Sequence, residues 1–491
     1  MSCTLTVGVM RTLLDDALTA ALACSAATLP VSKMLYTGHR SVMFTETSVV
    51  RGGPGAGKSL WARALIDPTL RAAAAHDLQM PRLTTAHVVS GHGVADAHQP
   101  TGRELKNLTD DAIRPVTLWT AVALTALNVA DITSLPTWHE RALWLTRNPD
   151  APRHVAHALN HQAHADTTVH LVVFDALDRI HPEQRIADHL ASGVLQLAAD
   201  LARLGPRVRA KVFLRPDTLY AALEALDSTD QRALCTTDLD WSAAGNLGQV
   251  SGAKLHGLLF HLLGNHEGPE SAAFRALTPG WRQNPDGRFT APAPLMRDPD
   301  AQERLFTAIA DLYMGANVRS GFTHHFLPAH LQDATGELSP RPFLTALRQA
   351  VRHAAAEHPD HTRALHHEDI RRGRSAGAHA RAAEVEAAMP WVRAALEPLA
   401  GQQLPIERKH ASSLWDEAGL PDRLRQLGAR TADPHPSGMR HLARYRDLVE
   451  ELIAAGVLRR GTTGLLDVAE PYRLAHRMGR KGGVAREPLA S

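Results

Sequence analysis

A glycine-rich stretch near the amino end carries residue types that bind phosphate. Residues 52–59 fit the pattern G-x-x-x-x-G-K-[ST], with Gly52 and Gly57 as the framing glycines. Glycines let the backbone fold around an anion with its N–H groups turned inward. The chemistry that this pattern predicts is the binding of a nucleoside triphosphate, with Lys58 at the β- and γ-phosphates and the Ser59 hydroxyl on Mg²⁺.

The positions expected to contact the nucleotide form one continuous segment. They are Gly52, Gly53, Pro54, Gly55, Ala56, Gly57, Lys58, Ser59 and Leu60. The segment follows a β-like run at 47–50 and precedes a helix-like run at 59–65, as the motif requires. The helix would present the positive end of its dipole to the same phosphates. A glycine turn with a nearby lysine also fits so short a pattern by chance, so a second element is needed.

That second element is an apolar run that ends in an acid. Residues 169–174 are nearly all apolar and are followed by Asp175. This pattern predicts a strand buried on both faces of a parallel sheet, with its carboxylate at the edge where such sheets bind ligands. We expect Asp175 to hold Mg²⁺, directly or through water. Ala176 occupies the next position, where many ATPases place the acid that orients water, so Asp178 is the candidate for that role.

The two segments resemble the Walker A and Walker B segments of P-loop nucleoside triphosphatases of the AAA+ and STAND types. The run Asp175-Ala176-Leu177-Asp178 resembles the STAND branch, in which a small residue follows the first aspartate and another acid follows two positions later. That branch usually has one more acid where this chain has Arg179. The resemblance implies an ATPase with ATP and Mg²⁺ as cofactors.

The resemblance also implies two arginines that sense the γ-phosphate. Arg215 lies near the carboxyl end of the predicted strand 208–217, which is the place of sensor 1 in AAA+-like ATPases, and the alternative is an ordinary salt bridge with Asp217. Arg341 stands just before an apolar helix, as sensor 2 does in the lid of AAA+ and STAND proteins. The alternative for Arg341 is a surface arginine.

The elements needed to position these residues predict an α/β fold: a parallel-sheet P-loop ATPase core, a helical lid and a C-terminal winged-helix domain. Further strands are predicted at 85–91, 208–217 and 234–239, and a long amphipathic helix at 186–204. A segment rich in proline, glycine and aspartate, 279–300, is predicted as a long exposed loop. The expected domains are an N-terminal helical entry segment at 1–45, a P-loop nucleotide-binding domain at 46–242, a helical lid domain at 243–370, a basic linker at 371–383, a winged-helix domain at 384–475 and a basic tail at 476–491.

The C-terminal region predicts three helices followed by a β-hairpin at 456–468, which together describe a winged helix. Such a module binds DNA in some ATPases and packs against the nucleotide domain in others. The arginines that would meet DNA phosphates are Arg440, Arg444, Arg446, Arg459 and Arg460.

Composition excludes several classes of protein. The chain has 491 residues, 44% hydrophobic and 21% charged, with a net charge of +2, as in ordinary soluble globular proteins of about two to four domains. Its 3 cysteines are widely spaced and make neither a disulfide framework nor a zinc cluster. Two uncharged runs, at 17–32 and 115–130, are shorter than the ~18 residues of a membrane span, and the first lacks the basic segment of a signal peptide.

Histidine is abundant, with 29 residues, and it gathers at 324–325, 358–361 and 366–367. None of these groups has the H-E-x-x-H spacing that places two histidines and an acid on one helix face. We therefore expect solvated helix faces at these positions.

The expected function is a cytoplasmic, Mg-dependent ATPase that couples its nucleotide state to the C-terminal module. The resemblance implies a bacterial signalling or defence switch that forms homo-oligomers or binds a protein partner, with no membrane partner. Two alternatives stay open: a DNA-binding ATPase of the initiator or partition type, and a scaffold that binds nucleotide without hydrolysing it.

Overall fold

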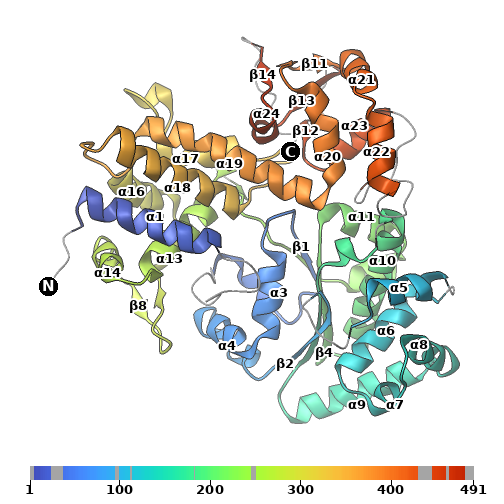
Figure 1. Cartoon of the computed structure of the whole chain (residues 1–491). Coiled ribbons are helices and arrows are strands. Elements are labelled where there is room, and N and C mark those ends of the chain that lie inside the picture. Colours follow the sequence, from blue (N-terminus) through green and yellow to red (C-terminus); the bar gives the residue numbers. More distant parts are fainter. Residues whose placement is uncertain are drawn as a thin grey trace.

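A five-stranded parallel sheet forms the centre of the region that contains the glycine-rich segment (Figure 1). The computed structural model describes residues 5–23, 37–93, 99–110, 113–181, 183–244, 250–429, 439, 445–459 and 464–481. The strands are β1 (Val49–Arg51), β2 (His87–His92), β3 (His170–Phe174), β4 (Val208–Leu214) and β5 (Thr236–Asp238). Their spatial order is β2-β3-β4-β1-β5, and every pairing is parallel. The predicted α/β class with a parallel sheet is therefore confirmed.

Alternate residues of the strands face two separate hydrophobic cores. Val50, Val173 and Phe213 belong to the core that contains the helices after β1, whereas Val172 and Val212 belong to the core on the other face. This alternation follows from the two-residue period of a strand, and it explains why these strands are apolar almost throughout.

Helices cover both faces of the sheet. The first face carries α3 (Lys58–Ile66) and α4 (Pro68–Asp77). On the second face α6 (Pro115–Ala126) and α10 (Gln184–Leu204) pack together. The remaining helices of this region are α5 (Gly102–Asp110), α7 (Ala130–Thr133), α8 (Trp138–Arg147), α9 (Ala151–Ala165), α11 (Pro216–Glu224) and α12 (Ser228–Ala233).

A helical lid follows, and the first helix of the chain packs into it. Its helices are α13 (Ala253–Asn265), α14 (Pro269–Ala276), α15 (Ala293–Arg297), α16 (Pro299–Ile309), α17 (Thr323–Leu331), α18 (Pro340–Glu357) and α19 (His367–Ala388). Figure 1 shows α1 (Val7–Ala23) alongside α18, and the guanidinium of Arg11 donates to the carbonyls of Ala364 at 3.0 Å and His358 at 2.7 Å. The amino-terminal helix is thus tied to the segment that connects α18 and α19.

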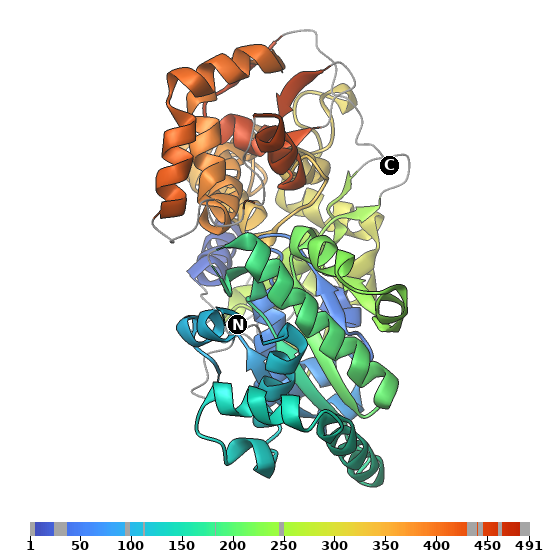
Figure 2. The same cartoon turned by 90° about the vertical axis from the view of Figure 1, so that its right-hand side faces the viewer.

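The C-terminal part has a hydrophobic core of its own and forms the upper body, coloured orange to red, in Figure 2. Its helices are α20 (Pro390–Leu396), α21 (Arg408–Glu417), α22 (Leu420–Ala429), α23 (Tyr445–Ala454) and α24 (Glu470–Ala475). Its strands are β10 (Gln403–Leu404), β11 (Ile406–Glu407), β12 (Leu458–Arg459), β13 (Leu465–Val468) and β14 (Gly479–Arg480). Strands β11, β13 and β12 form an antiparallel sheet that includes both strands of the predicted hairpin.

Three predictions about connecting segments were wrong. Residues 371–383, predicted as a basic linker, lie inside α19, where a Cβ atom at Gly373 would overlap the backbone of α18. The predicted loop 279–300 contains a hairpin of β8 (Arg282–Gln283) and β9 (Phe289–Thr290) as well as α15. Part of the predicted tail forms β14, which pairs with β10.

The physical reason is the same in these cases, because composition alone marked the segments as solvent-exposed. Glycines in α19 serve close helix packing, and Arg288 in the predicted loop is buried with its Nη1 2.7 Å from Asp77 Oδ2 on α4. Charged and small residues have buried partners here that lie far away in the sequence.

Candidate functional site

The glycine-rich segment forms a tight loop between β1 and α3. Gly55 and Gly57 have φ angles of +79° and +100°, a region that other residues adopt only with strain. Gly57 is the N-cap of α3, and the Gly52 N–H donates to the Leu214 carbonyl of β4 at 3.0 Å. The loop is therefore anchored to the sheet at one end and to a helix N-terminus at the other, which is the geometry of an anion site.

The Lys58 ammonium lies folded over this loop. Its Nζ donates to the carbonyls of Gly52 at 2.7 Å and Gly53 at 2.9 Å. Burial lowers the pKa of Lys58, and the nearby carboxylates of Asp178 and Asp175 oppose that effect. The lysine and the two acids identified in the sequence therefore lie within electrostatic reach of one another, although more than one hundred residues separate them.

Asp175 follows directly after β3 and is only 2% exposed. Burial raises the pKa of Asp175, and a hydrogen bond from the Ser59 side chain lowers it. Ala176 has a φ of +57°, which turns the chain into the short 3₁₀ turn that contains Asp178. A serine hydroxyl and a carboxylate side by side are hard oxygen ligands, so this pair fits Mg²⁺.

Arg215 is buried at the end of β4, 2% exposed, between two acids. Its Nε and Nη2 donate to Asp217 at 3.1 and 2.9 Å, and its Nη1 lies 3.7 Å from Asp178 Oδ2. The ordinary salt bridge considered from the sequence is thus present. The same guanidinium also reaches Asp178, which places it next to the Lys58 group.

Arg341 lies elsewhere, in the first turn of α18, and is exposed. Its positive charge acts on Glu384 of α19, whose pKa is raised by burial and lowered by Arg381, Ser339 and Arg341. Arg341 is therefore at the lid side of the loop and not among the residues gathered around Asp178.

Residues of the lid that were not predicted from the sequence also contact the loop. A Cβ atom at Gly53 would overlap Glu337 Oε2, and one at Gly55 would overlap the carboxylate of Glu384. Arg381, 1% exposed, donates from Nη1 to the Pro54 carbonyl and from Nη2 to Asp333 Oδ2, both at 2.8 Å. Arg381 came from the segment predicted as a linker, so no local signal distinguished it.

The carboxylates of Glu337 and Asp333 in the lid also repel each other. Burial and the neighbouring Asp333 raise the pKa of Glu337 to about 7, against the charges of Arg381 and Lys58. The lid side of the loop consequently holds more carboxylates than its one buried guanidinium can pair.

A cavity of about 480 Å³ adjoins the loop where the sheet, lid and C-terminal part meet. Its walls include Gly53 and Pro54 of the loop, Asp240 after β5, Glu337 of the lid and Trp391 of α20. Gly52, Ala56 and Arg215 also line it, whereas Lys58 and Ser59 do not.

The C-terminal arginines divide into two groups. Arg446 is exposed on α23, and Arg459 is partly buried on β12. Arg440, Arg444 and Arg460 lie outside the described residues.

Within the described part of the chain, no helix combines the length and apolar character that a membrane crossing requires.

The sequence matches no protein-family model and no curated protein. Among solved structures, the chain is similar to the ORC2 protein of Aeropyrum pernix, solved in complexes with ADPNP and ADP. The identity is 13% and the TM-score 0.30, over 95% of this chain and 93% of that chain. A likeness at this level does not establish family or activity, which have to be argued from the site itself.

Proposed function

We propose that this protein is an Mg²⁺-dependent P-loop ATPase of the AAA+ type that acts as a molecular switch. The observation that carries the proposal is the arrangement of Lys58, the bonded pair Ser59 and Asp175, and Asp178 at one edge of a parallel sheet. Phosphoryl transfer from ATP to water needs positioning and charge stabilisation more than covalent chemistry, so a small charged group of this kind suffices.

Each residue has a definite role in this proposal. The N–H groups of the loop and the Lys58 ammonium bind the phosphates, while Ser59 and Asp175 would hold Mg²⁺, whose positive charge would help to neutralise the phosphates. Asp178 orients the attacking water. Arg215, held against Asp178, reports the γ-phosphate to β4, and Arg341 does so to α18.

The carboxylates of the lid would transmit nucleotide binding from the loop to the lid and the C-terminal part. Glu337 and Glu384 lie directly against the loop, next to the place where the triphosphate would add several negative charges. Like charges at such short range repel, so ATP favours a lid position in which these carboxylates have moved away. Because Glu470 of α24 pairs with Arg374 of α19 at 2.9 Å, a shift of α19 also reaches the C-terminal part.

The deciding experiment is Lys58→Ala in the full chain. We expect ATP turnover to fall by about 10²–10³-fold, because a charge that stabilises the transition state is removed. Lys254→Ala is the matched control, since Lys254 bonds the Asp240 carbonyl and should leave turnover close to wild type. Equal turnover in wild type and Lys58→Ala would refute the ATPase proposal, and nucleotide binding without any turnover in wild type would support a scaffold.

Two finer assignments belong to the same proposal. The Asp-Ala-Leu-Asp run supports the STAND branch, with a cytoplasmic signalling or defence role and assembly of homo-oligomers or binding of a protein partner. The exposed Arg446 on α23, beside the antiparallel sheet, supports DNA binding by an initiator- or partition-type ATPase as the alternative. DNA binding that falls steeply with salt and weakens in Arg446→Ala favours this alternative, whereas no binding at low salt excludes it.

A further inference from the structure

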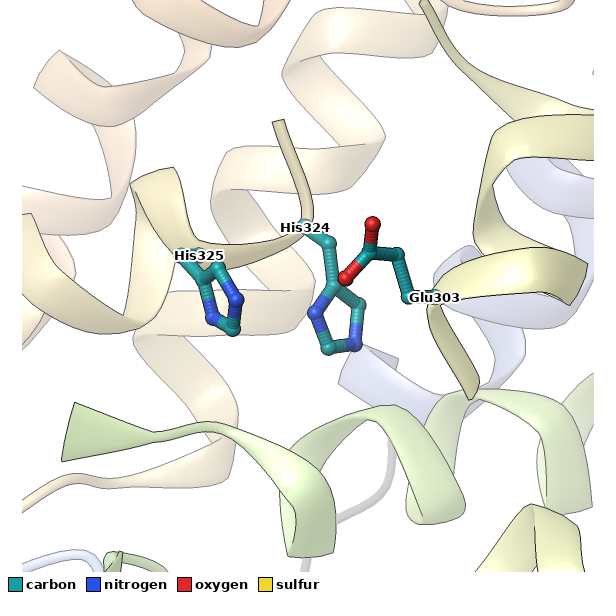
Figure 3. Close-up of side chains that lie close together, drawn as sticks. All are labelled: Glu303, His324 and His325. Carbon is teal, nitrogen blue, oxygen red and sulfur yellow. The ribbon is translucent and has the colours of Figure 1, made fainter. Parts of the chain in front are cut away.

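Three metal-ligating side chains meet in the lid, away from the phosphate loop. Glu303 comes from α16, and His324 and His325 come from the first turn of α17. Their ligand atoms all lie within 4.8 Å of one another. Figure 3 shows the His324 ring between the Glu303 carboxylate and the His325 ring. The spacing in sequence gives no sign of this group, because the acid is on a different helix.

His324 is not the solvated residue expected from the sequence, since it is 2% exposed. Both of its ring nitrogens and Nδ1 of His325 are buried without a hydrogen-bond partner in the described part of the chain. Each such orphaned polar atom costs about 1–3 kcal/mol, so native proteins rarely leave several together. The expectation of solvated faces was wrong here because the apolar lid core surrounds the ring.

Aromatic rings enclose the His324 side chain. The ring of His256 stacks on His324 with centroids 3.8 Å apart, and Phe306 packs edge-on at 5.8 Å. A neutral imidazole with an available lone pair is the species that ligates a metal.

We propose that Glu303, His324 and His325 form a site for a divalent transition metal of the Zn²⁺ class. Two imidazoles and one carboxylate are a common ligand set for such ions, at about 2.0–2.2 Å from the metal. Closing the group onto an ion requires its ligand atoms to draw together by rotations of the partly exposed Glu303 and His325 side chains. The ion would give a buried nitrogen of His324 a partner and would join α16 to α17.

A second group of histidines in the lid makes an internal comparison. Asp311 Oδ1 lies 2.8 Å from His361 Nε2, and Asp311 Oδ2 lies 3.1 Å from His367 Nδ1. These nitrogens already have a carboxylate partner, so they are satisfied without an ion. The orphaned nitrogens therefore favour the Glu303 group over the Asp311 group.

The test uses the full chain, stripped with a chelator and titrated with Zn²⁺ in a metal buffer that suppresses weak binding to surface histidines. We expect one equivalent of Zn²⁺ to stay bound through gel filtration and to raise the melting temperature. His324→Gln and, separately, Glu303→Gln should each lower the Zn²⁺ affinity at least tenfold and remove the thermal shift. Replacement by Co²⁺ should give visible absorption bands that both variants lack.

Control variants separate this site from the other histidines. His161→Gln, on the exposed face of α9, and Asp311→Asn should both keep the tightly bound equivalent. Should His324→Gln fail to fold, Glu303→Gln provides the same readout from a partly exposed position. A wild-type chain that retains no Zn²⁺, or one whose Zn²⁺ is lost in Asp311→Asn and kept in Glu303→Gln, would overturn the proposal.

Discussion

The phosphate loop touches charged residues on two sides, and the two sides are organised differently. On the sheet side, Lys58 faces Asp175 and Asp178, which are carried by strand ends and a short turn. On the lid side, Arg381 donates to the Pro54 carbonyl and to Asp333, with Glu337 and Glu384 packed against the glycines. In the proposed function, the sheet side carries the residues that would act on a ligand, whereas the lid side holds the loop through the hydrogen bond from Arg381 to Pro54.

The loop therefore has a cation, Lys58, on one side and carboxylates, Glu337 and Glu384, on the other, and these would act on a bound anion in opposite directions. In the proposed function, Lys58 attracts a triphosphate and the lid carboxylates repel it, so its binding would weaken the contact between the loop and the lid. A ligand moves an equilibrium only through such differential interactions. Substitutions on the two sides should therefore separate stability from catalysis.

The largest effect is expected on the lid side, from Arg381→Met. Removing one partner of a buried ion pair leaves the other charge unpaired and costs about 3–5 kcal/mol. We expect the free energy of unfolding in urea to fall by that amount. Arg393→Ala is the control, because Arg393 pairs with Glu397 at 2.9 Å on the exposed surface, where such pairs contribute about 0–1 kcal/mol. If both variants lose the same free energy of unfolding, the buried ion pair of Arg381 contributes no more to stability than an exposed pair does.

On the sheet side, Asp178→Asn should reduce ATP turnover by about 10²–10³-fold, equal to roughly 2.7–4 kcal/mol, if it orients the attacking water. Stability should change little, because Asp178 makes a longer ion pair with Arg215 than Asp217 does. The matched control is Asp131→Asn, at an exposed position on α7. Wild-type turnover in Asp178→Asn would move the water-orienting role to another residue.

Glu337→Gln should change how stability depends on pH. The folded pKa of Glu337 is about 7, above its ordinary value of 4.5, so the folded protein holds this proton more tightly than the unfolded chain. The resulting stabilisation is complete below about pH 4.5 and is lost as the pH rises through about 7, by up to about 3 kcal/mol. Unfolding measured from pH 5 to pH 8 should show this decline in wild type and a smaller one in the variant. If the free energy of unfolding depends on pH in the same way in wild type and Glu337→Gln, the ionisation of Glu337 does not affect stability.

The smallest effect is expected from Arg341→Ala. Arg341 is exposed, so its loss should change stability by under about 1 kcal/mol. If Arg341 meets the γ-phosphate only after the lid has moved, ATP affinity should fall by a few-fold while ADP affinity stays unchanged. If Arg341→Ala binds ATP and ADP with the same affinities as the wild type, Arg341 has no part in sensing the γ-phosphate.

Several features were predictable from the sequence because they depend on neighbouring residues. The glycine spacing before Lys58 determines a loop between a strand and a helix, and an apolar run that ends in Asp175 determines a central strand. Parallel strands expose their carboxyl ends at a common edge, so even the meeting of these two segments could be expected. The hairpin strands β12 and β13 followed from the same kind of local pattern.

The tertiary structure alone decided which charged residues are buried. Arg381 in an apparently basic linker, Arg288 in an apparent loop and His324 in an apparently solvated pair all have the composition of surface residues. Each lies in the interior because helices from distant parts of the chain pack around it. The sequence by itself determined the phosphate loop and the strand that supplies its acid, since both are set by local periodicity and backbone freedom. The contacts between the lid and that loop, and the proximity of Glu303 to His324 and His325, exist only after folding, because they depend on distance in space and not on separation along the chain.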